Sequence, residues 1–143
     1  MIHDAQNLFS DAQALTANAV STNIIDLGAA RNVGVGNPIY VVLCVDVAFS
    51  DSGNNSTVTV DLQGDSTTSF TPDGTQTLFS IATNAAAGTV YIARIAPDAA
   101  GQFQYIRLNY TMVNGDVSTG TVTAFLAHDV QKYQSYADAI TIS

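Results

Sequence analysis

The sequence has very few of the residues that build catalytic, metal or disulfide-linked sites. Cys44 is the single cysteine, which excludes an intrachain disulfide. One cysteine and two histidines are too few for a zinc centre. Neither His3 nor His128 has a partner at the spacing of a known motif, so no serine–histidine–aspartate set can be inferred. We therefore expect no enzymatic activity and no catalytic, metal-binding or cofactor-binding residue.

Positive charge and glutamate are also scarce. The chain has four lysines and arginines against 12 acidic residues, all of them aspartate, and its net charge is −8. Nucleic-acid phosphates require clustered lysine or arginine, so we expect no nucleic-acid partner. Glutamate and lysine favour helices, and their scarcity beside abundant threonine, valine, serine and glycine predicts a β protein.

Long apolar runs are missing too. No stretch approaches the roughly 20 apolar residues of a membrane helix, so we expect no membrane partner. The first residues, Met1–Asp4, carry no basic segment and no apolar segment follows them. We therefore expect synthesis in a cytoplasm.

Short alternating segments separated by polar turns dominate what remains. At 143 residues we expect one domain. Without helices between the strands, parallel βαβ units are excluded, and an all-β, two-sheet antiparallel sandwich of immunoglobulin or jelly-roll type is expected. Seven to nine strands are predicted, with segments at 21–27, 39–49, 56–63, 76–82, 88–95, 103–112 and 120–126.

Residues 103–126 read as two strands joined by Asn114-Gly115-Asp116, a strong hairpin signal because Asn and Gly tolerate positive φ. The shared apolar face would pair Met112 with Val122, Tyr110 with Ala124 and Leu108 with Leu126. The other face is mostly polar but carries Phe103, Tyr105 and Phe125. Two interpretations stay open: a solvated face, or a surface that another subunit covers.

The segment 39–49 is nearly continuous in apolar residues, which predicts a strand buried on both faces. Cys44 lies in this run and is expected to act as a small buried hydrophobe.

The N-terminal residues contain a repeat, Asp4–Leu8 and then Asp11–Leu15, offset by seven. If helical, Ala5, Leu8, Ala12 and Leu15 share one stripe, with Asp4 as the cap. We expect residues 1–15 to form an extended or short-helical arm before a single sandwich domain at 16–143. Whether that arm packs on its own sheet or docks on a neighbouring subunit stays open.

Five segments, in this order, carry a family resemblance: Asp4–Leu15, Val20–Gly28, the strand Tyr105-Ile106-Arg107-Leu108-Asn109-Tyr110, Gly120–Ala124, and Tyr136–Asp138. Together they resemble the capsid cement, or decoration, proteins of tailed double-stranded-DNA phages, particularly short-tailed ones.

The resemblance implies a jelly-roll-like homodimer on the outer surface of the virion capsid. It would bridge neighbouring capsomers of the phage major capsid protein and stabilise the head against the pressure of packaged DNA. We expect the interface residues to be apolar and aromatic side chains, namely Leu8, Phe9, Tyr105, Phe125, Tyr133 and Tyr136. The alternative for these residues is ordinary core packing. An alternative function is a carbohydrate-binding β-sandwich of a phage fibre or receptor-binding component, with an exposed row of aromatics.

Overall fold

The protein is seen in a computed structural model that describes residues 4–32, 35–96, 103–128 and 130. These residues form one short 3-10 helix and nine strands, in agreement with the expected all-β class. The elements are η1 (Ala5–Asn7), β1 (Leu8–Ala14), β2 (Ala19–Val20), β3 (Ile25–Arg31), β4 (Tyr40–Ser50), β5 (Thr57–Asp65), β6 (Gly74–Ile81), β7 (Val90–Arg94), β8 (Phe103–Val113) and β9 (Thr119–Ala127). Within the described residues, no helix has the length and apolar character needed to cross a membrane.

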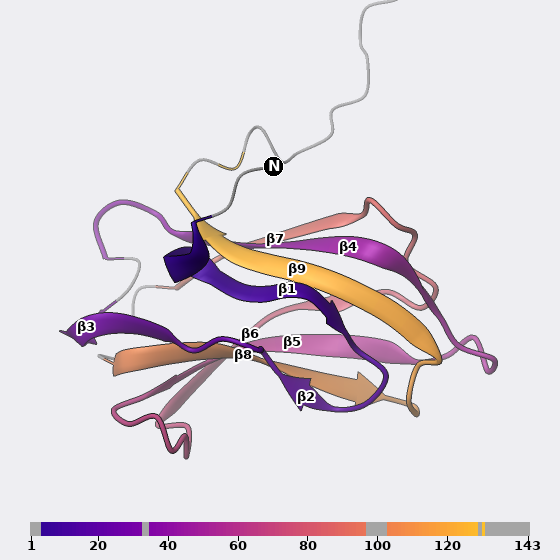
Figure 1. Ribbon diagram of the computed structural model, residues 1–143, viewed down its shortest axis with the longest axis horizontal. Coiled ribbons are helices and arrows are strands. Elements are labelled where there is room, and N and C mark those ends of the chain that lie inside the picture. The colour runs from indigo at the N-terminus through magenta and orange to yellow at the C-terminus, as the bar shows by residue number, and fades with distance from the viewer. Residues whose placement is uncertain (1–3, 33–34, 97–102, 129, 131–143) are drawn as a thin grey trace, which may run out of the picture.

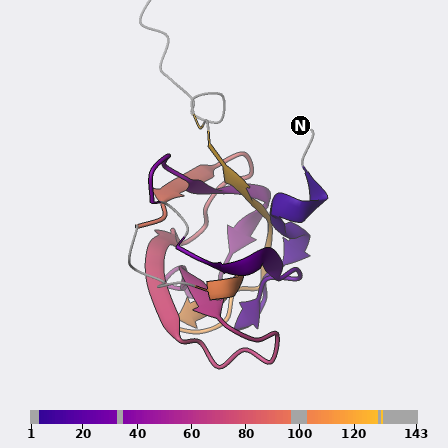
Figure 2. The same ribbon diagram turned by 90° about the vertical axis from the view of Figure 1, so that its left-hand side faces the viewer.

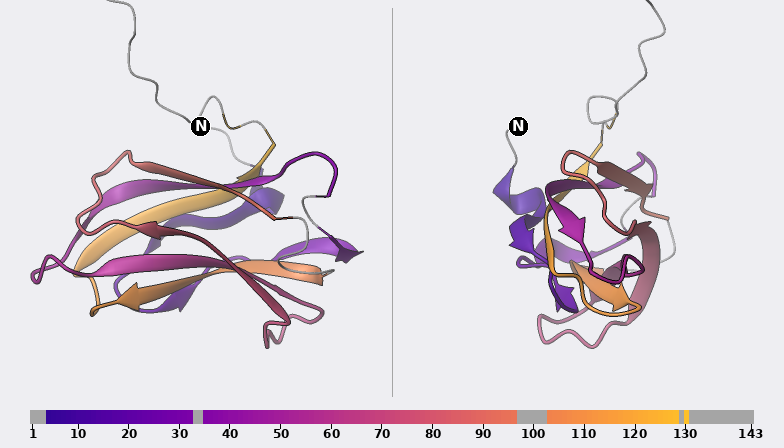
Figure 3. Two further views of the ribbon diagram at one scale, coloured as in Figure 1. Left: turned by 180° about the vertical axis from the view of Figure 1, so that it is seen from behind. Right: turned by 90° about the vertical axis from the view of Figure 1, so that its right-hand side faces the viewer.

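Two antiparallel sheets pack face to face (Figure 1, and from behind in Figure 3). We call the sheet with strand order β1-β9-β4-β7 sheet A. Sheet B has the order β2-β8-β5-β6, and β3 also pairs with β8. The chain changes sheet at almost every connection, and strands β2 and β3 share one position beside β8. Eight strand positions in this order form a jelly roll, which confirms the expected sandwich.

The inner faces of both sheets supply the core, because alternate side chains of each strand point to it. In β5 the buried residues are Val58, Val60 and Leu62, as the alternation of the sequence predicts. Val41, Leu43 and Val45 of β4 face them from sheet A. The end-on view in Figure 2 shows the two layers enclosing this interior. Tyr110 of β8 is the largest side chain that is fully buried.

The predicted hairpin at 103–126 is wrong. The turn residues do have positive φ, 67° at Asn114 and 111° at Gly115. However, β8 belongs to sheet B and pairs with β5, with Met112 opposite Val58, whereas β9 belongs to sheet A between β1 and β4. The loop therefore carries the chain from one sheet to the other. The apolar rows of β8 and β9 meet across the core instead of side by side, so the predicted cross-strand pairs do not form.

The N-terminal segment is part of sheet A and does not form a separate arm within the described residues. Asp4 caps the single turn η1 by accepting a hydrogen bond from the Gln6 N–H at 3.0 Å, as the sequence predicts. The following residues are extended and pair as β1 with β9, with Leu8 opposite Phe125. A two-turn apolar stripe is too short to hold a helix, and pairing with β9 satisfies the backbone instead. The division expected at residue 15 is thus not a boundary of the fold.

A buried hydrogen bond ties β1 to the opposite sheet. The hydroxyls of Ser10 and Tyr110 lie 2.7 Å apart, and both residues have no exposed surface. Ser10 donates its only hydroxyl proton to Oε1 of Gln13, also at 2.7 Å, so Tyr110 must be the donor to Ser10. Burial raises the pKa of the Tyr110 phenol, which keeps this proton in place at neutral pH.

Candidate protein-interaction surface

The outer face of sheet A carries an apolar row that crosses all four strands. Strand registers place Leu8 of β1 opposite Phe125 of β9, Phe125 opposite Val42 of β4, and Val42 opposite Ile92 of β7. Leu8, Val42 and Phe125 form a second hydrophobic cluster, separate from the main core. Four half-buried residues pack against this cluster, namely Cys44, Ile92, Ala127 and Val130. We call these seven residues the sheet A patch.

The middle strand of this sheet explains the patch. In β4 the odd-numbered residues Val41, Leu43 and Val45 enter the core, so Val42 and Cys44 face outward. A strand that is apolar on both faces is typical of a position covered on both sides. Val42 has no exposed surface although it faces away from the core. The continuous apolar run in the sequence therefore correctly predicted burial on both faces.

Beside the patch, a small polar network fixes the geometry of three strands. Thr123 of β9 donates to Oδ2 of Asp46 on β4 at 2.6 Å, and its Oγ1 accepts the Ala12 N–H of β1 at 3.0 Å. Ala12 has a φ of +45°, where the pairing of β1 with β9 is irregular. Such a bulge interrupts the regular ladder at an edge strand, which opposes uncontrolled edge-to-edge pairing.

Cys44 is an unreactive member of the patch. Burial raises the pKa of its thiol, and the nearby Asp46 carboxylate raises it further. Because the thiolate is the nucleophilic form of cysteine, this environment suits a packing role. The expectation of a small hydrophobe agrees with this position, although the side chain is only half-buried.

The outer face of sheet B is polar by comparison. Arg107 of β8 donates from Nε to Oε1 of Gln63 on β5 at 2.9 Å, and its guanidinium lies 4.2 Å from the centre of the Phe70 ring. Asp65 accepts the backbone N–H of Thr67 at 2.8 Å, and this bond is the main reason that its pKa is lowered. Arg107 and Oδ1 of Asp65 are thus held by groups of the same chain, whereas Oδ1 of Asp61 and Oδ2 of Asp65 are buried without a hydrogen-bond partner among the described residues.

The structure places four of the six predicted interface residues, in three different environments. Leu8 and Phe125 are neighbours in the sheet A patch. Phe9 lies in the main core with no exposed surface. Tyr105 is half-buried on β8, where its hydroxyl accepts a hydrogen bond from Gln104 at 3.2 Å. The last two, Tyr133 and Tyr136, lie outside the described residues.

Sequence reasoning missed Val42 and Ile92 as members of one outward surface. The signal for Val42 was the apolar run itself, because a central strand with two apolar faces needs a cover on each side. Ile92 lies in a short strand whose pattern is interrupted by Tyr91 and Arg94, and only its pairing with Val42 reveals the shared row. No group of three metal-binding side chains is present in the part of the chain that the structure describes.

Comparison with known proteins gives one family. The model of a protein family described as Bbp16 matches residues 9–126, which includes all strands from β2 to β8 and nearly all of β1 and β9. No curated protein matches the sequence.

Proposed function

The chain belongs to the Bbp16 family, a phage-derived family, and from this premise we propose that it is a structural virion protein. It binds the outside of the phage head, bridges neighbouring capsomers of the major capsid protein, and stabilises the capsid against DNA pressure. The observation that carries this proposal is the sheet A patch, an apolar row on the outer face of a sheet in a strongly acidic chain.

The contrast between the two outer faces supports sheet A as the side that meets the shell. Sheet B presents threonine, aspartate, glutamine and arginine outward, and Arg107 is already held by Gln63 and Phe70. On sheet A the row is apolar throughout: Leu8, Val42 and Phe125 are buried within the patch, and on the edge strand β7 Ile92 is half-buried and Val90 is 36% accessible. Interface cores are depleted of charge and enriched in apolar side chains, which matches sheet A alone.

The packing of the two sheets fits a role in resisting internal pressure. Two sheets share one core, and the buried Ser10–Tyr110 bond holds the N-terminal strand to the opposite sheet. Many copies on one shell need only modest affinity each, because simultaneous contacts to two capsomers raise the effective affinity. The proposal includes self-association as a homodimer, which light scattering coupled to size-exclusion chromatography measures directly.

A second candidate function, carbohydrate binding, is favoured by one observation. Gln104 joins the Tyr105 hydroxyl to Asp26 through bonds of 3.2 and 3.1 Å, which places an aromatic ring beside acidic and amide groups. A sugar-binding row needs several exposed aromatics, however, and Phe79 and Tyr91 stack on each other at 5.4 Å and pack against the main core. This candidate therefore ranks below capsid binding.

The test is co-sedimentation with capsids of the phage that encodes the chain. Ile92→Asp places a carboxylate in the proposed contact, and Thr77→Asp adds the same charge on β6, the exposed edge strand of sheet B. We expect stoichiometric, many-copy binding that Ile92→Asp weakens at least tenfold, consistent with an interface hot spot, and that Thr77→Asp leaves nearly unchanged. Circular dichroism establishes that both variants are folded. Absence of the wild-type chain from purified virions, with measurable glycan affinity, would favour the second candidate.

A further inference from the structure

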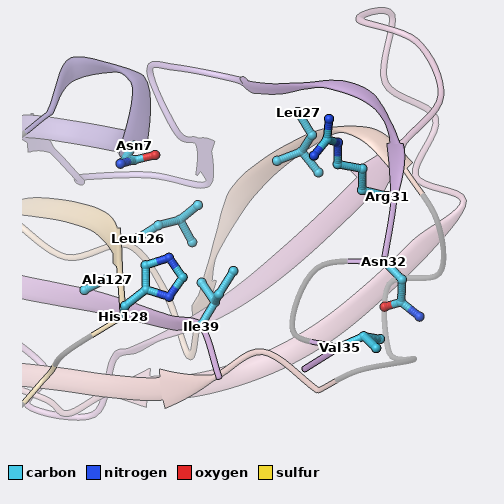
Figure 4. Close-up of a pocket in the computed structure, with 9 residues that line it drawn as sticks. All are labelled: Asn7, Leu27, Arg31, Asn32, Val35, Ile39, Leu126, Ala127 and His128. Carbon is cyan, nitrogen blue, oxygen red and sulfur yellow. The ribbon is translucent and has the colours of Figure 1, made fainter. Parts of the chain in front are cut away.

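The open end of the sandwich holds a cavity of about 330 Å³ between β3 and the ends of sheet A (Figure 4). On one side lie Leu27 and Arg31 of β3; on the other lie Ile39, Leu126 and His128. This cavity is separate from the sheet A patch, although Ala127 borders both.

The apolar wall of the cavity is a continuation of the main core. Leu27, Ile39 and Leu126 pack against that core and remain half-buried. Each inner face of the sandwich is closed by the other sheet, but at this end no side chain of the described residues fills the space beside these three. An apolar group that enters from outside would therefore complete the packing of these three residues and gain the free energy of removing their surface from water.

The rim of the cavity carries an arginine, a residue type that is scarce in this chain. Arg31 and His128 both border it, and the whole sequence has only four lysines and arginines. Within the described residues, neither side chain has an ion pair or a hydrogen bond. Arg107, in contrast, is held by Gln63 and Phe70. An arginine without a partner beside an apolar cavity is suited to bind a carboxylate in two-point geometry.

We propose that this cavity is a docking site for a peptide segment of a protein partner in which an acidic residue stands beside an aliphatic one. The aliphatic side chain lies against Leu27, Ile39 and Leu126, and the carboxylate accepts hydrogen bonds from Arg31. The volume is near the lower limit of ligand pockets and the rim residues are exposed, so the cavity holds one or two side chains and not a large, enclosed small molecule. This site goes beyond the capsid contact proposed for sheet A and does not depend on it.

Methyl and arginine Nε–H NMR spectra of the full chain test the proposal. The probes are the blocked peptides acetyl-Leu-Asp-Leu-amide and acetyl-Leu-Asn-Leu-amide, which differ only in charge at one position. We expect shifts at Leu27, Ile39, Leu126 and Arg31, with a Kd on the order of 1 mM for the acidic peptide and about fivefold weaker binding of the amide.

The matched variants are Arg31→Gln and Arg94→Gln, since Arg94 is an exposed arginine on β7 that does not line the cavity. Arg31→Gln is expected to remove the preference for the acidic peptide, whereas Arg94→Gln keeps it. Hexanoate, a carboxylate on an apolar chain without a peptide backbone, serves as a third probe. Four results would overturn the proposal: no shifts at the cavity, equal binding of both peptides to the wild type, an unchanged preference in Arg31→Gln, or hexanoate binding as tightly as the acidic peptide. Capsid co-sedimentation of the same variants is read separately, so failure here is distinct from failure of the capsid proposal.

Discussion

The hydrogen bond between Ser10 and Tyr110 predicts an asymmetric response to two small substitutions. Ser10→Ala leaves the phenol hydroxyl of Tyr110 inside the core without a partner, because Tyr110 has no exposed surface. An unsatisfied buried hydroxyl costs about 1–3 kcal/mol. Tyr110→Phe removes one bond, but Ser10 still donates to Gln13 at 2.7 Å, so the loss is about 1 kcal/mol.

The double variant Ser10→Ala/Tyr110→Phe separates the bond from the side chains that make it. Replacing both partners removes the orphaned hydroxyl, so the two single losses do not add, and a coupling free energy of about 1 kcal/mol is expected. For a chain of this size, each kcal/mol lowers Tm by about 2–4 °C.

Urea unfolding gives the free energies for all four proteins, provided that the slope with denaturant is unchanged. Ser10→Ala must cost more than Tyr110→Phe. If Ser10→Ala is neutral, or if Tyr110→Phe is the more damaging change, then β1 is not held to sheet B through this bond. The attachment of β1 would then rest on its pairing with β9 within sheet A.

Three further predictions concern single side chains. Burial raises the pKa of the Tyr110 phenol, so the stability that depends on its protonated form is complete below the unfolded pKa of about 10 and is lost as pH rises above it. The Tyr110→Phe variant should therefore show a shallower loss of Tm above that pH. Equal slopes in the two proteins would contradict this prediction. Gly120→Ala places a methyl group against the Phe49 ring, so the free energy of unfolding should fall by about 1–3 kcal/mol in thermal unfolding. Adding Phe49→Leu to the same chain should restore part of this loss. An unchanged Tm in Gly120→Ala would show that the ring moves freely. Backbone N–H groups, led by that of Asn55, lower the pKa of Asp51 to about 2. The ionised Asp51 therefore stabilises the fold above the unfolded pKa, and this stabilisation is lost as pH falls through about 2. Between pH 4 and pH 2, the Tm of Asp51→Asn should fall less than that of the wild type.

The sequence predicted the faces of the strands well, because alternation reports which side chains point to a core. It predicted Val58, Val60 and Leu62 as inward, and they are buried. The apolar run of β4 predicted a covered central strand, and β4 lies between β9 and β7.

Strand partners were not predictable from the same signal. The apolar rows of β8 and β9 could meet side by side in a hairpin or face to face across a core, and both arrangements use the same alternation. Asn114 and Gly115 adopt positive φ in either case. The choice depends on β5 and β4, which are distant in sequence and supply the actual neighbours.

The candidate surface was predicted in part. Leu8 and Phe125 were selected as apolar residues, and their direct pairing became visible only in the sheet. Phe9 is as apolar as its neighbour Leu8, but it points into the main core, because neighbouring residues of a strand face opposite sides. For Tyr133 and Tyr136, which lie outside the described residues, the interface role stays a prediction.

The most direct measurement of the central claim is hydrogen–deuterium exchange on the chain, free and bound to purified capsids. We expect new protection on the edge strand β7 of sheet A, in the peptide Val90–Arg94, because β7 pairs with β4 on one side only. Exchange in the β6 peptide Gly74–Ile81 of sheet B should change little. Protection confined to sheet B, or no change in either sheet despite stoichiometric binding, would contradict the account.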